Sequence, residues 1–263
     1  MEYRTKKKFG QHFLNDQYII DQIIQAADIQ SGDRVVEIGP GLGVLTERLL
    51  EVAAQVEVFE IDRDLISRLE NRNNPRLLIH SGDILKANLP ALLNTPPYNL
   101  VANLPYNISS QVVFLLLANR QLFSSMVLMF QKEVGDRLCA EPGCKDYGIL
   151  SVLCQLWYDV DPVVHVGPES FSPPPKVDSL VLRFSPLPGP RVDVGDAAFF
   201  AKVVKASFTQ RRKQLRNSLV AGGFSRDQVD QGLSVAQIEP SRRGESLDLH
   251  DFSRLSKALH QLF

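Results

Sequence analysis

The sequence predicts an α/β fold with a doubly wound, mostly parallel sheet, followed by a small all-helical domain. From about residue 33 to residue 184, short β-branched and apolar runs alternate with longer helical patterns. This alternation is typical of parallel strands joined by crossover helices. The breakers in Pro186–Pro190 interrupt both kinds of pattern. We therefore expect a first domain at residues 1–187 and a helical domain at residues 188–263.

Six runs are predicted strands because they are short, apolar and bounded by polar or turn-forming residues. They lie at residues 35–38, 56–59, 77–79, 98–102, 124–131 and 180–184. A helix is expected at 44–52, and amphipathic helices in the tail at 197–219, 226–233 and 247–262. In open α/β sheets, ligands bind beyond the carboxyl ends of the strands, where the strand order reverses. The functional residues are expected at that edge.

The composition limits the possible classes of protein. The chain has 263 residues, 44% hydrophobic and 22% charged, with a formal net charge of −1, so any nucleic-acid surface must be a local basic patch. Cys139, Cys144 and Cys154 form no C-x-x-C pair, and neither a disulfide framework nor a metal site is expected. No apolar run is long enough to span a bilayer, and a cytoplasmic location is expected.

A glycine-rich segment, Glu37–Gly43, follows the first predicted strand and precedes a helix. Glycines at such a turn let a ligand approach the backbone and the first amides of the helix. Glu60 ends the second predicted strand, where an acid can accept hydrogen bonds from ribose hydroxyls. Asp83 follows the third strand and could accept one from an adenine amino group. Together these residues predict a nucleoside-binding cleft.

The glycine spacing alone leaves a nicotinamide or flavin cofactor open, because it differs from the dinucleotide pattern by one position. The carboxylate of Glu37, directly before the glycines, would repel a pyrophosphate. It would suit a cation such as the ammonium group of a methionine. We therefore favour a nucleoside cofactor with a cationic tail.

Asn103-Leu104-Pro105-Tyr106 follows the fourth predicted strand, at the same sheet edge. An aromatic amino group is a poor nucleophile because its lone pair is delocalised into the ring. The Asn103 amide oxygen and the Leu104 carbonyl could accept its two N–H groups and point the lone pair at an electrophilic methyl group. Pro105 would hold the turn, and Tyr106 would stack on an unstacked target base, with Phe171 as a candidate second stacking face. No essential general base is expected.

Nine motifs in order carry a resemblance to a known family. They are Lys8–Leu14, Glu37–Gly43, Glu60–Asp62, Gly82–Asp83, Asn103–Ser109, Gln131–Glu133, Phe171–Ser179, Gln210–Lys213 and Arg216–Leu219. Together they closely resemble the ribosomal RNA adenine N6-dimethyltransferase family, with the KsgA-type small-subunit enzymes as the nearest match. The resemblance covers nearly the whole chain.

The resemblance implies a Rossmann-like class I S-adenosylmethionine-dependent methyltransferase. Its expected activity is dimethylation of the N6 amino groups of two adjacent adenines near the 3′ end of 16S ribosomal RNA. The expected partner is small-subunit ribosomal RNA within an immature 30S particle, with no membrane association and a monomeric protein. Matched positions place a set of residues in the S-adenosylmethionine site: His12, Leu14, Gly39, Glu60, Asp83 and Asn103. Because some members have Asn at position 12, His12 is expected to make a polar contact rather than act as an acid or base.

Two basic clusters are candidate RNA contacts. The segment Arg4–Lys8 forms an arm before the first helix, and Arg211, Arg212, Lys213 and Arg216 gather in the first long helix predicted for the tail. Both clusters could neutralise phosphates. Because the net charge is close to zero, recognition is also expected to depend on the shape of the ribosomal particle.

Two alternatives remain open from the sequence. A large-subunit adenine methyltransferase of the erythromycin-resistance type shares the cofactor and reaction motifs, although Phe171–Ser179 and the tail favour the small-subunit enzymes. A non-catalytic ribosome-assembly factor with a vestigial pocket is the other alternative. The intact acids Glu60 and Asp83, together with Asn103 and Tyr106, argue against it.

Overall fold

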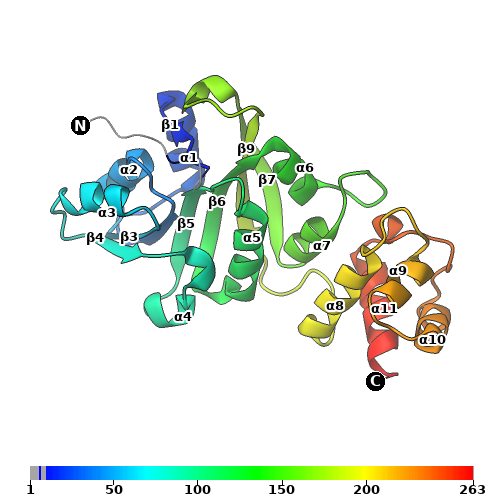
Figure 1. Cartoon of the computed structure of the whole chain (residues 1–263). Coiled ribbons are helices and arrows are strands. Elements are labelled where there is room, and N and C mark those ends of the chain that lie inside the picture. Colours follow the sequence, from blue (N-terminus) through cyan, green and yellow to red (C-terminus); the bar gives the residue numbers. More distant parts are fainter. Residues whose placement is uncertain (1–5, 7–9, 263) are drawn as a thin grey trace. The chain divides into compact units, whose positions relative to one another are not determined.

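The computed structural model describes residue 6 and residues 10–262, and the chain divides into two compact units (Figure 1). The first unit comprises residues 1–135 and 160–186, and the second comprises residues 136–159 and 187–263. The segment 136–159 therefore groups with the helical tail, whereas the sequence places it in the first domain. None of the described helices is long and apolar enough to cross a membrane.

A sheet with the strand order β4-β3-β2-β5-β6-β9-β7 organises the first unit. Its strands are β2 (Arg34–Ile38), β3 (Gln55–Glu60), β4 (Leu77–Ser81), β5 (Tyr98–Asn103), β6 (Phe123–Gln131), β7 (Tyr158–Val166) and β9 (Ser179–Pro186). The strands from β4 to β6 pair in parallel, and β9 is antiparallel to β6. All six predicted strands are confirmed. The prediction lacks β7, and also the separate antiparallel pair β1 (Phe13–Leu14) and β8 (Phe171–Ser172).

Helices cover both faces of this sheet, and their buried apolar side chains hold them there. The helices are α1 (Gln17–Ala27), α2 (Val44–Val52), α3 (Arg63–Glu70), α4 (Leu89–Leu92), α5 (Ser109–Ala118) and α6 (Lys132–Cys139). Ile20 of α1 and Leu49 of α2 join one apolar cluster with Val35 and Val101 of the sheet, while α5 lies on the other face (Figure 1). The strand order reverses between β2 and β5, so a ligand cleft is expected beyond the ends of these two strands.

The second unit is helical. Its helices are α7 (Ile149–Gln155), α8 (Ala197–Ser207), α9 (Leu215–Ala221), α10 (Arg226–Ala236) and α11 (Leu249–His260). The single helix predicted at 197–219 is wrong, because the chain turns at residues 208–214 between α8 and α9. The polar run from Gln210 to Lys213 has no apolar side chain to bury against the unit. The backbone N–H of Leu215 then donates to the carbonyl of Arg242 instead of continuing α8.

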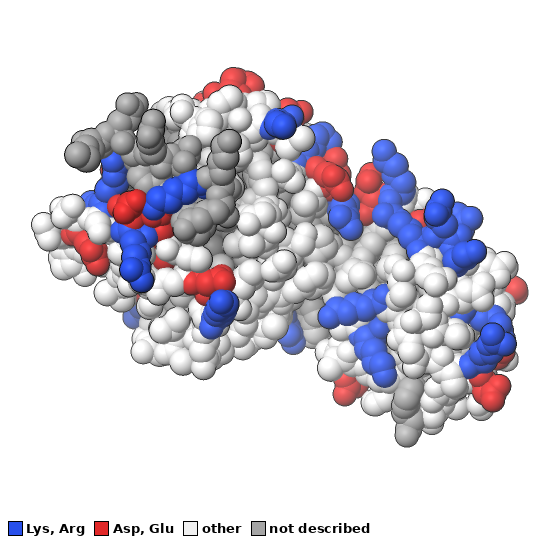
Figure 2. All heavy atoms as spheres, in the orientation of Figure 1, with Lys and Arg blue, Asp and Glu red and all other residues white. Residues whose placement is uncertain are grey.

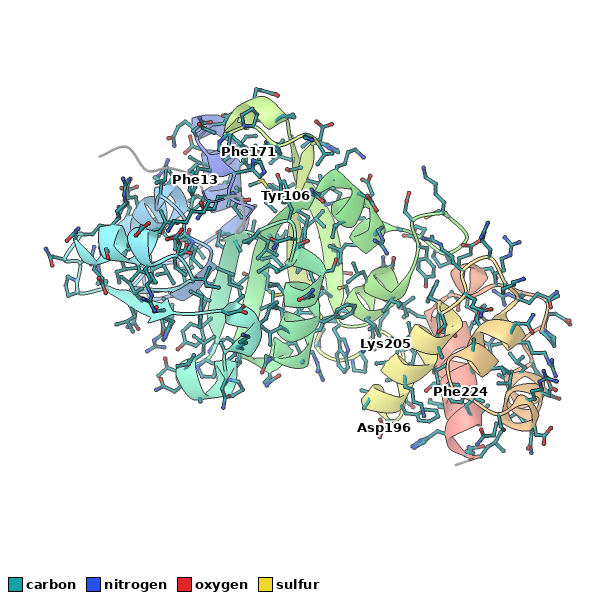
Figure 3. All side chains as sticks on the ribbon, viewed as in Figure 1. Phe13, Tyr106, Phe171, Asp196, Lys205 and Phe224 are labelled. Atoms are coloured by element: carbon teal, nitrogen blue, oxygen red, sulfur yellow. The ribbon has the colours of Figure 1, made fainter. Side chains whose placement is uncertain are left out.

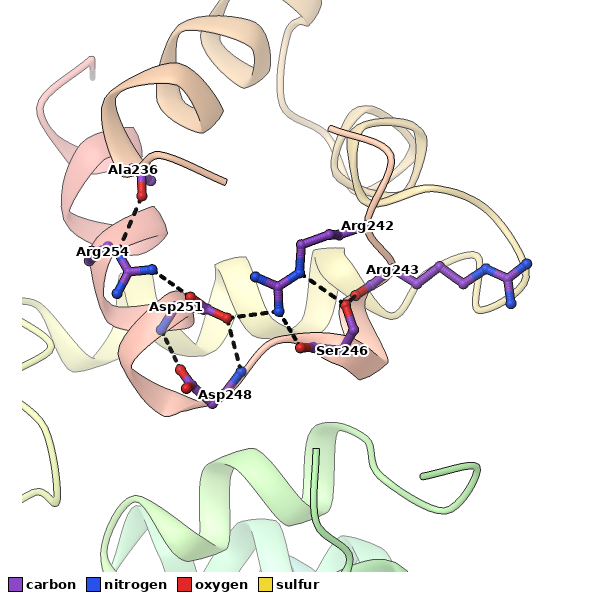
Figure 4. Close-up of polar contacts among 7 residues, drawn as sticks. All are labelled: Ala236, Arg242, Arg243, Ser246, Asp248, Asp251 and Arg254. Atoms are coloured by element: carbon purple, nitrogen blue, oxygen red, sulfur yellow. Dashed lines mark hydrogen bonds and ion pairs between the residues drawn. The ribbon is translucent and has the colours of Figure 1, made fainter. Parts of the chain in front are cut away.

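An ionic cluster around Asp251 ties the start of α11 to the segment before it (Figure 4). One carboxylate oxygen lies 2.9 Å from Nη2 of Arg242, and the other lies 2.5 Å from Nη2 of Arg254. The backbone N–H of Asp251 also donates to the side chain of Asp248, 2.7 Å away, which caps the helix. Because the Asp251 side chain is only 11% exposed, solvent screens these contacts weakly.

Replacing Asp251 with Ala should destabilise the protein by about 2 kcal/mol, because two guanidinium groups lose their shared partner and one is only partly hydrated. Urea unfolding measures the change. Lys257→Ala is the matched control, since it removes an exposed ion pair with Asp193 of the same unit and should cost less than about 1 kcal/mol. Equal losses in the two variants would contradict the importance of the buried cluster.

Candidate active site

A cleft of about 320 Å³ lies beyond the carboxyl ends of β2, β3 and β5. Its lining residues come from five segments and lie at positions 10–14, 37–42, 44–45, 59–61, 65, 82–85 and 103–108. Nine of the ten residues predicted for the cofactor and reaction sites are among its lining residues. They are His12, Leu14, Gly39, Glu60, Asp83, Asn103, Leu104, Pro105 and Tyr106. The structure therefore brings together segments that are up to 94 residues apart in the chain, from His12 to Tyr106.

The glycine turn forms one wall of the cleft. Gly39, Gly41 and Gly43 all have left-handed backbone conformations, with φ of +69°, +58° and +85°. A Cβ at position 41 would lie only 3.0 Å from the ring of Phe13. The turn thus needs glycine both for its backbone and for the close approach of the N-terminal segment. It leaves room for a ligand to lie against the backbone.

Glu60 is held by backbone amides at the end of β3. Its Oε1 accepts hydrogen bonds from the N–H groups of Ile61 and Asp62 at 2.8 and 2.9 Å, and its Oε2 accepts one from Gly41 at 3.4 Å. Burial raises the pKa of this carboxyl, and the amides oppose that shift. The long contact leaves Oε2 able to accept a stronger bond from a ligand hydroxyl. Asp83 caps the turn after β4, accepting from the N–H of Leu85 at 3.0 Å.

Glu37 lines the cleft but is almost fully buried, with 1% of its surface exposed. The hydroxyl of Thr46 on α2 donates to its carboxyl group at 2.6 Å. Burial raises the pKa of Glu37 to about 8, against the opposing effect of that hydrogen bond. The ligand-free protein therefore holds this group mainly uncharged at pH 7. The predicted attraction between Glu37 and a cationic ligand therefore depends on ionisation of this carboxyl, which a bound cation would favour.

Asn103 and Tyr106 line the cleft after the end of β5. The Asn103 side-chain N–H donates to the backbone carbonyl of His12, 3.4 Å away, which leaves the amide oxygen of Asn103 for another donor. The imidazole of His12 stacks on the Tyr106 ring with centroids 5.6 Å apart and an interplanar angle of 23°. Its Nδ1 lies 2.8 Å from the carbonyl oxygen of Pro173. His12 is thus engaged with the tyrosine ring and with the segment before β9.

Phe171 is not among the lining residues of the cleft. It pairs with Leu14 across β1 and β8, and the residue, labelled in Figure 3, is 3% exposed within the apolar core of the first unit. In this conformation the ring has no open face for a base. A stacking role for Phe171 requires the ring to become exposed, and it stays a prediction.

The predicted RNA-contacting residues lie in the second unit, where Lys and Arg gather on the face that Figure 2 shows. Arg211 lies 3.5 Å from Glu245, and Arg216 contacts both carboxylate oxygens of Asp230 at 2.5 Å. Arg212 and Lys213 are exposed in the turn at 208–214, and among the described residues no ion pair involves either. Of the basic arm at residues 4–8, only Lys6 lies within the described residues.

The sequence alone did not identify two polar residues at the cleft. The buried carboxylate of Asp62 accepts from the Lys6 ammonium at 2.6 Å and from the Gln11 amide at 3.1 Å, so it fastens the N-terminal segment beside the cleft. Ser179 of β9 lies 2.6 Å from the Tyr106 hydroxyl. Both residues belong to recognised motifs, but their partners are distant in sequence, and no local pattern indicates the contacts. No metal site of three or more His, Cys, Asp or Glu occurs among the described residues.

The raised pKa of Glu37 predicts a pH-dependent stability in the ligand-free protein. Between pH 4.5, its ordinary value, and about 8, the folded state keeps a proton that the unfolded state loses. The free energy of unfolding should therefore fall as pH rises through this range. Glu37→Gln should remove that contribution, as measured by urea unfolding across the range. Glu47→Gln, at an exposed carboxyl on α2, is the control and should keep the wild-type slope, whereas equal slopes in wild type and Glu37→Gln would contradict the assignment.

Comparisons with known proteins agree with this geometry. The family model "Ribosomal RNA adenine dimethylase" matches residues 2–261. The chain is 55% identical to Ribosomal RNA small subunit methyltransferase A of Syntrophotalea carbinolica over the full length of both. A solved dimethyladenosine transferase from Plasmodium falciparum is 31% identical, with a TM-score of 0.78, over 93% of this chain and 96% of the other. The solved 23S rRNA methyltransferase ErmE is 26% identical, with a TM-score of 0.68, over 95% and 100%. The chain belongs to the ribosomal RNA adenine dimethylase family.

Proposed function

We propose that this protein transfers methyl groups from S-adenosylmethionine to the N6 amino groups of two adjacent adenines near the 3′ end of 16S ribosomal RNA. The observation that carries the proposal is that one cleft contains both the residues proposed to bind the cofactor and the residues proposed to position the target amino group. The nucleoside acceptors Glu60 and Asp83 line it together with Asn103–Tyr106. The substrate follows from the 55% identity to a protein named as a small-subunit methyltransferase.

The cleft fits S-adenosylmethionine, which supplies an electrophilic methyl group. We assign its ribose hydroxyls to Glu60 and its adenine amino group to Asp83. The glycine turn, whose Gly41 approaches Phe13 too closely for a side chain, leaves the backbone of Gly39 open to the cofactor. His12 and Leu14 complete the site from the N-terminal segment. Glu37 lies where a cationic tail would restore its charge.

Methyl transfer in this site depends on positioning. The Asn103 amide oxygen, which its contact with His12 leaves unused, accepts one N–H of the target amino group, and the carbonyl of Leu104 accepts the other. These two bonds turn the nitrogen lone pair toward the methyl group. Pro105 restricts the turn, and the Tyr106 ring stacks on the adenine after it leaves its base stack. No side chain needs to remove a proton before transfer, because the nitrogen would release its proton to solvent after it accepts the methyl group, and S-adenosylhomocysteine would be left in the site.

The enzyme is proposed to act as a cytoplasmic monomer on immature 30S particles. The turn at 208–214 then supplies RNA contacts through Arg212 and Lys213, with Arg211 and Arg216 contributing where RNA competes with their carboxylate partners. A large-subunit target of the erythromycin-resistance type is disfavoured, because identity to ErmE is 26% and identity to the small-subunit enzyme is 55%. The intact cleft argues against a purely non-catalytic assembly factor.

Replacing Asn103 with Ala should lower turnover by about 10²–10³, because one acceptor that aligns the amino group is lost. Transfer of labelled methyl groups to unmethylated small subunits measures this, and mapping the labelled nucleotides tests the proposed target. Asn99→Ala, at the other end of β5, is the control and should keep wild-type turnover. Near-normal dimethylation by Asn103→Ala would refute the role of Asn103, and wild-type label outside the two adenines would refute the proposed substrate.

The double variant Arg212→Ala/Lys213→Ala should weaken binding to small subunits and flatten its salt dependence. If each residue neutralises one phosphate, the slope of log affinity against log salt should fall by roughly 1.5. Binding assays at several salt concentrations measure this slope. The charge-matched control is Arg191→Ala/Lys257→Ala, which removes two cations of the same unit that pair with Asp159 and Asp193. An unchanged slope in the Arg212/Lys213 variant would make the turn an ordinary solvated surface.

A further inference from the structure

The Tyr106 hydroxyl is held by a single buried side chain. Its oxygen lies 2.6 Å from Oγ of Ser179, the first residue of β9. Ser179 has no exposed surface and is paired with Gln131 of β6 in the sheet. The hydroxyl that meets Tyr106 is therefore fixed by the backbone of the main sheet rather than by a loop. A half-buried tyrosine hydroxyl also needs such a partner to avoid a desolvation cost.

The segment before Ser179 holds the second ring of this site. His12 stacks on Tyr106, and its Nδ1 lies 2.8 Å from the carbonyl oxygen of Pro173. Three consecutive prolines, Pro173–Pro175, follow β8 and restrict the backbone of this segment. Residues 173–179 thus contact both rings, at Pro173 through a carbonyl and at Ser179 through a hydroxyl. His12 covers part of one face of the tyrosine, so a target base would stack on the other face.

We propose that Ser179 is a positioning residue for methyl transfer, acting through the Tyr106 ring. The inference rests on the proposed role of Tyr106 as the stacking face for the target adenine. The torsion χ1 sets the direction of the long axis of that ring, and the hydroxyl bond at the far end of the axis restrains it. Without the bond, the ring and the stacked base can swing away, and small displacements of a reacting group cost large factors in rate.

The test is a double-mutant cycle with Ser179→Ala and Tyr106→Phe. Each single variant should lower kcat about tenfold at saturating cofactor, as expected for loss of one restraining hydrogen bond. The affinity for S-adenosylhomocysteine and the KM for S-adenosylmethionine should stay within about twofold of wild type. The double variant should be no slower than either single variant, because both remove the same bond. A general structural defect would instead weaken cofactor binding and add to the effect of Tyr106→Phe.

The protein contains a matched control at the start of β5, the strand that precedes Tyr106 in the chain. There, the buried Tyr98 shares a hydroxyl hydrogen bond of 2.9 Å with Thr95. Tyr98→Phe removes the same kind of bond away from the cleft and should keep wild-type kcat. A tenfold loss in Tyr98→Phe as well would show that the effect is not specific to the reaction site and would overturn the inference.

Tyr106→Ala separates this inference from the proposed function. If Tyr106→Ala lowers kcat strongly but Ser179→Ala does not, the stacking role of Tyr106 stands and the positioning role of Ser179 is overturned. Additive losses of kcat in the double variant Ser179→Ala/Tyr106→Phe would also overturn the positioning role of Ser179. If Tyr106→Ala keeps wild-type turnover, the proposed role of Tyr106 fails and the inference fails with it.

Discussion

The parallel pairing of β2 with both β3 and β5 is the constraint on which the rest of the site depends. Ile38 of β2 lies opposite Phe59 of β3, and Glu37 lies opposite Val101 of β5. This register places the glycine turn, Glu60 and Asn103 at the same edge of the sheet, where β2, β3 and β5 end. Because helices pack closely on both faces of the sheet, a slip of one residue would exchange the side chains of the two faces and lose their packing partners. The core therefore fixes the register, and the register fixes the site.

The same edge concentrates carboxyl groups, and the structure accommodates each one differently. Glu37 accepts a hydrogen bond from a hydroxyl group and has a raised pKa, while Glu60 accepts hydrogen bonds from backbone amides. Asp62 accepts hydrogen bonds from the Lys6 ammonium group and from the Gln11 side-chain amide. Lys6 is the one cation that pairs with any of these three carboxyl groups among the described residues. Such an edge disfavours a pyrophosphate and suits a ligand with positive charge, which agrees with a sulfonium cofactor rather than a dinucleotide.

Sequence patterns predicted the parts of the fold that are local. The central strands and α2 follow from short apolar runs and from the glycine turn, whose residues are adjacent in the chain. The sequence did not predict β7, because its residues 158–166 include Asp159, Asp161 and Pro162, which interrupt an apolar run. The end of α8 at Ser207 was not predicted because helical periodicity continues past it in the sequence. The chain turns there, and the backbone of Leu215 bonds to Arg242, which is a tertiary contact that no local pattern indicates.

The cleft also contains one part that local sequence patterns indicate and one part that depends on tertiary contacts. The part proposed to bind the cofactor is built from strand ends and the turns that follow them, so topology alone indicates Gly39, Glu60 and Asp83. The part proposed to hold the target base is assembled around Tyr106 by His12 and Ser179, which lie 94 and 73 residues away in the chain. These contacts require β9 to be in register with β6 and the N-terminal segment to be fastened at Asp62. The geometry proposed to align the target base thus depends on the completed tertiary structure, whereas much of the proposed nucleoside site depends on the parallel sheet alone.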